Sequence, residues 1–164
     1  MGDVTHTAGF KAVAITAAQD LFEVRAPTAG IFIVHGFSLY QTTDLADAAE
    51  EILRLTTNRG NGSVTSGSGG SSATAHVKQR GAQALASGGA VEVNNTTVLA
   101  AGSGTLLNDI EHFGWNIRIP MMHWWTPESR PIILPTDYWT LELEAAPADS
   151  ITASGTIYLE QISA

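Results

Sequence analysis

The residues best able to do chemistry in this sequence are its histidines, and their spacing does not build a metal site. There are five of them: His6, His35, His76, His112 and His123. Local zinc motifs pair two histidines across a short spacer or within an HExxH helix, and no pair here fits either pattern. His35 lies inside an apolar segment, where we expect a hydrogen-bonded core or inter-subunit histidine. The sequence therefore predicts no metal ion and no cofactor.

The serines and glycines do not indicate a nucleophile or a phosphate-binding loop. Gly67-Ser68-Gly69 and Gly102-Ser103-Gly104 place serines between glycines, but neither stands between a strand and a helix, as a nucleophile elbow requires. The tract Gly60–Gly70 lacks the lysine and the following helix of a phosphate loop. We interpret these residues as turns and loops.

The carboxylates also fail to form a recognisable site. One group does not match the spacing of a calcium-binding loop and is interpreted as a capped, solvated turn: Asp44, Asp47, Glu50 and Glu51. A second group could supply the paired acids of a glycoside hydrolase: Glu92, Asp109, Glu111, Glu142 and Glu144. Within it, Glu142 and Glu144 alternate outward along one predicted strand and resemble solubilising charges. No acid and base pair stands out, so the sequence predicts a protein that is not an enzyme.

Composition indicates one soluble domain. The chain has 164 residues, no cysteine, 44% hydrophobic and 15% charged residues. This length is sufficient for a packed core without disulfides or metals, and the low charge suggests that part of the surface does not face water. The net charge of −8, with basic residues scattered, argues against nucleic-acid binding. No apolar run is long enough to cross a bilayer, and the first residues lack a secretory signal pattern.

The elements that would position these residues are predicted to be strands. Runs rich in β-branched and aromatic residues, bounded by turn signals, are 10–17, 21–26, 31–40, 52–57, 90–99, 113–119, 132–134, 138–143 and 151–161. The clearest alternation is in Tyr138–Leu143, where Trp139, Leu141 and Leu143 share a face. Only Asp44–Glu51 has helical character, enough for one turn. This pattern predicts an all-β fold, an antiparallel β-sandwich of the jelly-roll type spanning residues 1–164.

Two segments do not fit this regular pattern. Asn58–Ala75 consists of Gly, Ser, Thr and Asn with almost nothing apolar, which predicts a long, flexible, exposed loop. Met121–Pro135 concentrates Met, Trp and Pro, and proline is excluded from central strands. Exposed Trp, Met and Arg are enriched at interfaces, so we expect contacts from six residues: Met121, Met122, Trp124, Trp125, Arg130 and Ile132. The alternative is that Trp124 and Trp125 close the end of the core.

Several strings together resemble the small jelly-roll structural proteins of tailed bacteriophage virions, meaning head decoration or cement proteins and their relatives. They are Ala18–Pro27, Ile33–Leu39, Glu51–Leu55, Trp124–Ile132 and Leu143–Glu160. The resemblance implies a protein without enzymatic activity that forms a homo-oligomer, a trimer, and binds the major capsid protein or another virion protein. It also implies location on the capsid surface after synthesis in the host cytoplasm.

A second function stays open at this point. Jelly rolls commonly present loops and aromatic residues that stack on sugar rings, so the chain could be a carbohydrate- or receptor-binding module of a tail or surface adhesin. Its platform residues would be Trp124, Trp125 and Trp139.

Overall fold

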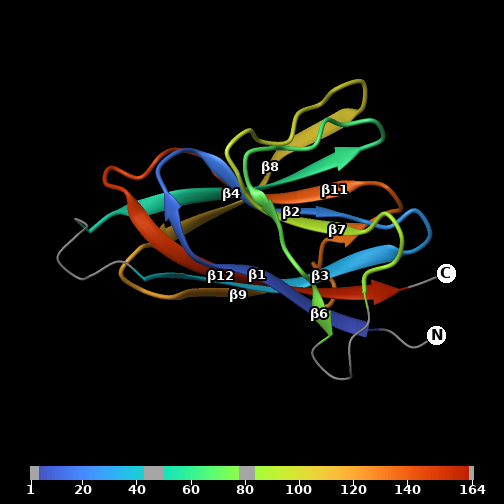
Figure 1. The fold of residues 1–164 in the computed structure, drawn as a ribbon, viewed down its shortest axis with the longest axis horizontal. Coiled ribbons are helices and arrows are strands. Elements are labelled where there is room, and N and C mark those ends of the chain that lie inside the picture. Colours follow the sequence, from blue (N-terminus) through green and yellow to red (C-terminus); the bar gives the residue numbers. More distant parts are fainter. Residues whose placement is uncertain (1–3, 43–49, 78–83, 163–164) are drawn as a thin grey trace.

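The fold consists of two antiparallel sheets that pack face to face (Figure 1). The structure, a computed structural model, describes residues 4–42, 50–77 and 84–162, and all its regular elements in these ranges are β-strands. Sheet A contains β1 (Val4–Ile15), β3 (Ile31–Gln41), β6 (His76–Val77), β9 (Met121–Trp124), β10 (Ile132–Ile133) and β12 (Ile151–Ile162). Sheet B contains β2 (Gln19–Arg25), β4 (Ile52–Asn61), β5 (Ser71–Ser72), β7 (Ala90–Asn95), β8 (Thr105–Asn116) and β11 (Tyr138–Leu143).

The strand order is that of a jelly roll. Sheet A runs β1, β12, β3 and then β9 with β10, while sheet B runs β2, β11, β4 and β8. Most connections therefore carry the chain from one sheet to the other. As a result, the last strand, β12, lies between β1 and β3 in sheet A. The expected all-β sandwich is confirmed.

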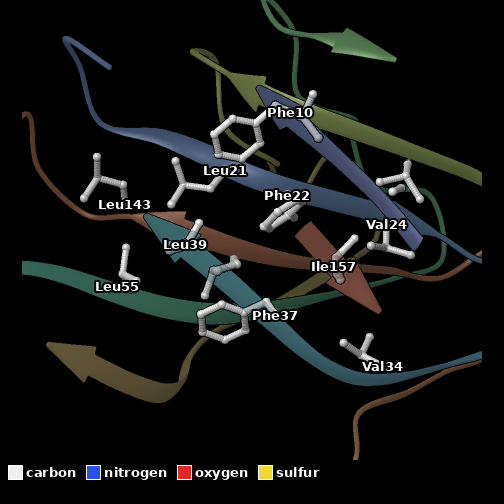
Figure 2. Close-up of a cluster of buried hydrophobic side chains, with 14 of the residues drawn as sticks. Phe10, Leu21, Phe22, Val24, Val34, Phe37, Leu39, Leu55, Leu143 and Ile157 are labelled. Carbon is white, nitrogen blue, oxygen red and sulfur yellow. The ribbon is translucent and has the colours of Figure 1, made fainter. Parts of the chain in front are cut away.

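The core lies between the sheets, where side chains from both inner faces meet (Figure 2). Phe37 and Leu39 of β3 and Ile157 of β12 project from sheet A, and Phe22 and Val24 of β2 project from sheet B. Each is fully buried, and burial of a side chain of this size stabilises the fold by about 1.5 to 3 kcal/mol. In β3 and β12, residues that alternate along the strand therefore supply the face that enters this core.

The connection between β4 and β8 extends both sheets on the same side of the sandwich. Its first part adds β5 to β7, its second part adds β6 to β1, and its third part adds β7 to β2. The green chain that leaves sheet B and reaches β6 in Figure 1 is this connection. The edges of both sheets on this side are thus covered by additional strands.

The segment expected to be a long exposed loop begins later and is more ordered than its composition suggests. Asn58–Asn61 completes β4, paired with β11 and β8. The following residues run against 97–100 through two bridges, Thr65 with Ala100 and Ser68 with Thr97. Gly67 is buried, and a Cβ there would lie 2.6 Å from the carbonyl oxygen of Thr97. The backbone of this polar segment is therefore hydrogen-bonded to other parts of the same chain.

Other boundaries also differ from expectation. β1 begins at Val4 and β8 at Thr105, well before the predicted starts at residues 10 and 113. These early parts of the strands are polar, so their hydrophobic pattern is weak, but each pairs with a long neighbour, β12 or β4. Most of the expected helical turn at Asp44–Glu51 lies outside the described residues.

Candidate interaction surface

One side of the sandwich ends in strands that have a neighbour on only one side. Within the described residues, β8 is the last strand of sheet B, and β9 and β10 form the last row of sheet A. We call residues 105–134, which contain these three strands, the open edge. Strands of this kind present unpaired backbone N–H and C=O groups that can pair with another chain.

The open edge also carries most of the exposed apolar side chains. Seven of the nine large hydrophobic residues exposed in the described structure belong to it: Leu107, Ile110, Ile119, Met122, Trp124, Ile132 and Leu134. Their exposed fractions lie between 45% and 65%. Scattered exposed hydrophobics are ordinary, but a concentration along one edge is characteristic of an interaction site.

The edge row of sheet A is interrupted by a short excursion. The N–H of Trp125 donates to the carbonyl of His35 at 3.0 Å, and the N–H of Val34 donates to the carbonyl of Pro131 at 2.9 Å. Both contacts continue the pairing with β3, so residues 126–130 leave the row and return to it. Prolines are tolerated here because an edge strand lacks a partner on its outer side.

Trp125 anchors this excursion in the core. Its side chain is only 5% exposed, and its indole Nε1 donates to the carboxylate of Glu111 at 2.9 and 3.1 Å. Its ring meets Trp139 edge to face, with centroids 5.9 Å apart. Trp125 and Trp139 therefore close the core and leave little of either ring exposed, although Trp139 lines the inner end of a hollow at the open edge.

Trp124 points to the opposite face, on the outside of sheet A. It is 49% exposed, and its ring lies 4.7 Å from that of Tyr158. Both residues pair with Gly36 of β3, one from each side. A Cβ at Gly36 would lie 2.3 Å from the carbonyl oxygen of His123 and 2.9 Å from Trp124 Cε3, so the glycine lets β9 and the Trp124 ring lie this close to β3. Next to this pair of rings, His35 Nε2 of β3 and Glu160 Oε2 of β12 are hydrogen-bonded at 2.7 Å.

A hollow of about 380 Å³ opens between the two sheets at the open edge. Ile110 and Glu111 of β8 line one wall, Arg130 and Ile132 line the other, and Arg59 of β4 also contributes. The Nε atom of Arg130 is buried and has no hydrogen-bond partner within the described structure. The hollow therefore combines apolar walls with a guanidinium that can still accept an anionic partner.

The six expected contact residues thus occupy different environments. Met122, Trp124 and Ile132 are exposed, Arg130 is half-buried at the hollow, and Met121 is half-buried against the core. Trp125 is buried. The alternation along β9 separates them, because Met121, His123 and Trp125 face inward while Met122 and Trp124 face outward. Among the inward residues, the ring of His123 packs between those of Phe113 and Trp125 at 4.8 and 4.7 Å.

Two buried acids that sequence reasoning did not single out lie on β2. Asp20 Oδ2 accepts the N–H of Leu99 at 2.8 Å, and Glu23 Oε2 accepts the N–H of Gly67 at 2.8 Å. Burial raises the pKa of Asp20 to about 8, and the nearby charges of Glu142 and Glu23 add to the rise. These carboxylates hold the β4–β8 connection against sheet B, so their role is structural.

Glu142 is not the freely solvated charge that its alternation suggested. It is half-buried, and its Oε2 accepts the side-chain N–H of Asn58 at 2.6 Å. Burial raises its pKa, and the charges of Asp109 and Glu144 raise it further. Glu111, in contrast, faces the interior and binds Trp125. Asp109 and Glu144 do approach each other, with carboxylate oxygens within 4.8 Å.

Comparisons with known proteins leave the family of this chain undetermined. No family model and no curated protein matches it. A solved structure of infectious bursal disease virus, Gx strain, aligns over the whole chain with a TM-score of 0.19 and 9% identity. This chain spans 42% of the length of that one. A similarity this low carries no argument about function. No helix of the described residues is long and apolar enough to cross a membrane.

Proposed function

We propose that this chain is a structural protein of a tailed bacteriophage virion, a capsid decoration or cement protein without enzymatic activity. It forms a homotrimer and binds the lattice of the major capsid protein. The observation that carries the proposal is the open edge, where apolar side chains coincide with strands that lack an outer neighbour. The jelly-roll topology and the resemblance of the sequence strings support it.

The occupant proposed for the open edge is a second copy of the chain. Pairing of edge strands satisfies backbone groups of both copies and lets one apolar surface cover another. The net charge of −8 makes two copies repel each other overall, so the attraction has to be local, and Arg59 and Arg130 at the hollow can supply it despite the neighbouring Glu111. An acidic side chain of the neighbouring copy would pair with the buried Arg130 Nε.

The first experiment measures the mass of the purified chain by size-exclusion chromatography with light scattering. The wild-type chain should be a trimer, and the double variant Met122→Glu, Ile132→Glu should dissociate, because two charges would be buried in the contact. Ser72→Glu is the matched control, since Ser72 is exposed on β5 at the covered side. A wild-type chain that stays monomeric at high concentration would refute self-association.

The second experiment tests attachment to the shell. The chain should co-sediment with mature capsids that lack their own decoration protein and should protect them against heat or osmotic rupture. Failure to bind such capsids would contradict the decoration role even if the trimer is confirmed.

One observation favours a second candidate function, a carbohydrate- or receptor-binding module. The Trp124 and Tyr158 rings form an exposed pair on the outside of sheet A, and the hydrogen-bonded His35 and Glu160 lie next to it. Such a pair can stack on a sugar ring while neighbouring polar groups bind hydroxyls. A glycan array should then give a signal that Trp124→Ala abolishes and Tyr40→Ala retains. The absence of any glycan signal would remove this candidate.

A further inference from the structure

Three potential metal ligands converge on the outer face of sheet B. They are Asp109 and His112 of β8 and Glu144, which directly follows β11. One donor atom from each lies within 4.8 Å of the other two. Glu144 is half-buried while the other two are exposed, and together with Arg54 and Phe113 they line a hollow of about 360 Å³.

A β-bulge brings the first two ligands onto one face. Residues three apart in a regular strand point to opposite faces, so an unbroken β8 would direct Asp109 inward when His112 points outward. Pairing between β4 and β8 shifts between Thr57 and Arg59, and Asp109 has a φ of 57°, in the left-handed region. Bulges are known to re-aim side chains next to functional sites. The extra residues therefore place Asp109 on the side of His112.

The neighbouring strand β4 fixes this arrangement. The N–H of Asp109 donates to Asn58 Oδ1 at 3.0 Å, and the hydroxyl of Thr56 contacts Asp109 Oδ1 at 3.5 Å. The N–H of Glu144 donates to the carbonyl of Arg54 at 3.1 Å. Outer contacts of this kind orient the ligands of established metal sites. His112 is paired with Thr56 of the same strand, so all three ligands are positioned by β4.

We propose that Asp109, His112 and Glu144 bind a divalent transition-metal ion of the zinc class. One imidazole and two carboxylates suit such ions, whereas calcium and magnesium take oxygen ligands alone. His112 Nδ1 already lies 3.6 Å from Glu144 Oε1, near the roughly 3.4 Å that separates two ligands of a tetrahedral zinc ion. Three protein ligands leave a position for water or for a group from another molecule.

Arg54 is the cation that a bound metal would replace. Its Nε lies 3.7 Å from Glu144 Oε2, but its side chain is 76% exposed, so it can turn toward solvent. An exposed ion pair of this kind contributes little stability, and its loss is a small obstacle to binding.

The test is titration of the purified chain with zinc chloride by isothermal calorimetry, with calcium chloride as the ionic control. One zinc ion should bind per chain, with no comparable calcium signal. His112→Ala should weaken zinc binding about tenfold or more, and Asp109→Asn should do the same. His76→Ala is the matched control, because His76 is an exposed histidine on the short strand β6, and it should bind zinc as the wild type does.

Substitution of cobalt for zinc gives an independent readout. The wild-type complex should show visible absorption of a four- or five-coordinate cobalt ion, and His112→Ala should lose it. Equal zinc affinities in the wild type and His112→Ala, with circular dichroism showing both folded, would overturn the site. The light-scattering test of the trimer is done without zinc, so the metal site and the trimer can fail separately.

Discussion

The two sides of this sandwich differ in whether additional strands of the chain cover the edges of the sheets. On the covered side, the β4–β8 connection adds strands to both sheets and binds the buried carboxylates of Asp20 and Glu23. On the open edge, β8, β9 and β10 have no outer neighbour within the described residues, and apolar side chains remain exposed. The covered side is finished by the chain's own polar groups, whereas the open edge still has apolar surface and backbone groups that another molecule can cover.

The largest effect should come from the two adjacent tryptophans of the open edge. Trp125→Ala removes a buried ring and leaves the carboxylate of Glu111 without its indole donor, so the free energy of unfolding should fall by about 3 to 5 kcal/mol. Urea unfolding monitored by circular dichroism measures this loss. Trp124→Ala is the control and should cost about 1 kcal/mol or less, since half of that side chain is exposed. Similar losses for both would contradict the assignment of one to the core and one to the surface.

The covered side should show the next largest effect, through pH. The folded chain keeps the proton of Asp20 up to a pKa of about 8, whereas the unfolded chain releases it near the ordinary aspartate pKa of 3.8. The folded state therefore binds more protons between these values, and stability declines as pH rises through this window. Asp20→Asn keeps an oxygen for the Leu99 N–H and carries no charge, so it should be more stable than the wild type at pH 8 by a few kcal/mol.

Thermal unfolding of both chains from pH 4 to pH 9 measures this difference. The variant should have a flatter profile than the wild type. The raised pKa of Glu142 also makes stability fall as pH rises, so the variant will keep part of the wild-type pH dependence. A wild-type stability that increases steadily across the window would contradict the buried, protonated Asp20.

A smaller effect should follow from loosening the connection itself. Glu23 accepts hydrogen bonds from the Ser66 hydroxyl, the Gly67 N–H and the Asn95 amide. Glu23→Gln directs an NH2 group at these donors, which should cost about 1 to 3 kcal/mol. Hydrogen exchange should show the Gly67 amide losing protection while the β3 amides keep theirs. Unchanged exchange at Gly67 would show that Glu23 does not hold the connection.

The smallest effect on stability belongs to an exposed residue of the open edge. Ile132→Ser removes a side chain that is 45% exposed, so the free energy of unfolding should change by no more than about 0.5 kcal/mol. If the open edge binds a second copy, the same substitution should weaken the trimer, measured by light scattering over a dilution series. A large loss of stability in a monomeric preparation would place Ile132 in the core instead.

The sequence by itself determined the fold class and the faces of the regular strands. Alternation in Tyr138–Leu143 predicted that Leu141 and Leu143 face one way, and both are fully buried in the core. The same holds for Ile157 and Leu159 of β12. Such predictions succeed because the period of two is a local property of an extended chain, and one buried face is enough to reveal it. Met121–Pro135 was also predicted as edge or loop chain, since proline cannot pair within a central strand.

Only the tertiary structure decided the rest. Adjacent tryptophans must face opposite ways, but the pairing of β9 with β3 determines that Trp125 is the buried one. Polar residues of Asn58–Ala75 are ordered by partners far along the chain, among them Glu23 and residues 97–100, so their composition could not reveal it. The bulge that turns Asp109 toward His112 depends on register with β4. In each case the physical reason is the same: the outcome depends on which distant residues lie opposite, and a local pattern contains no information about them.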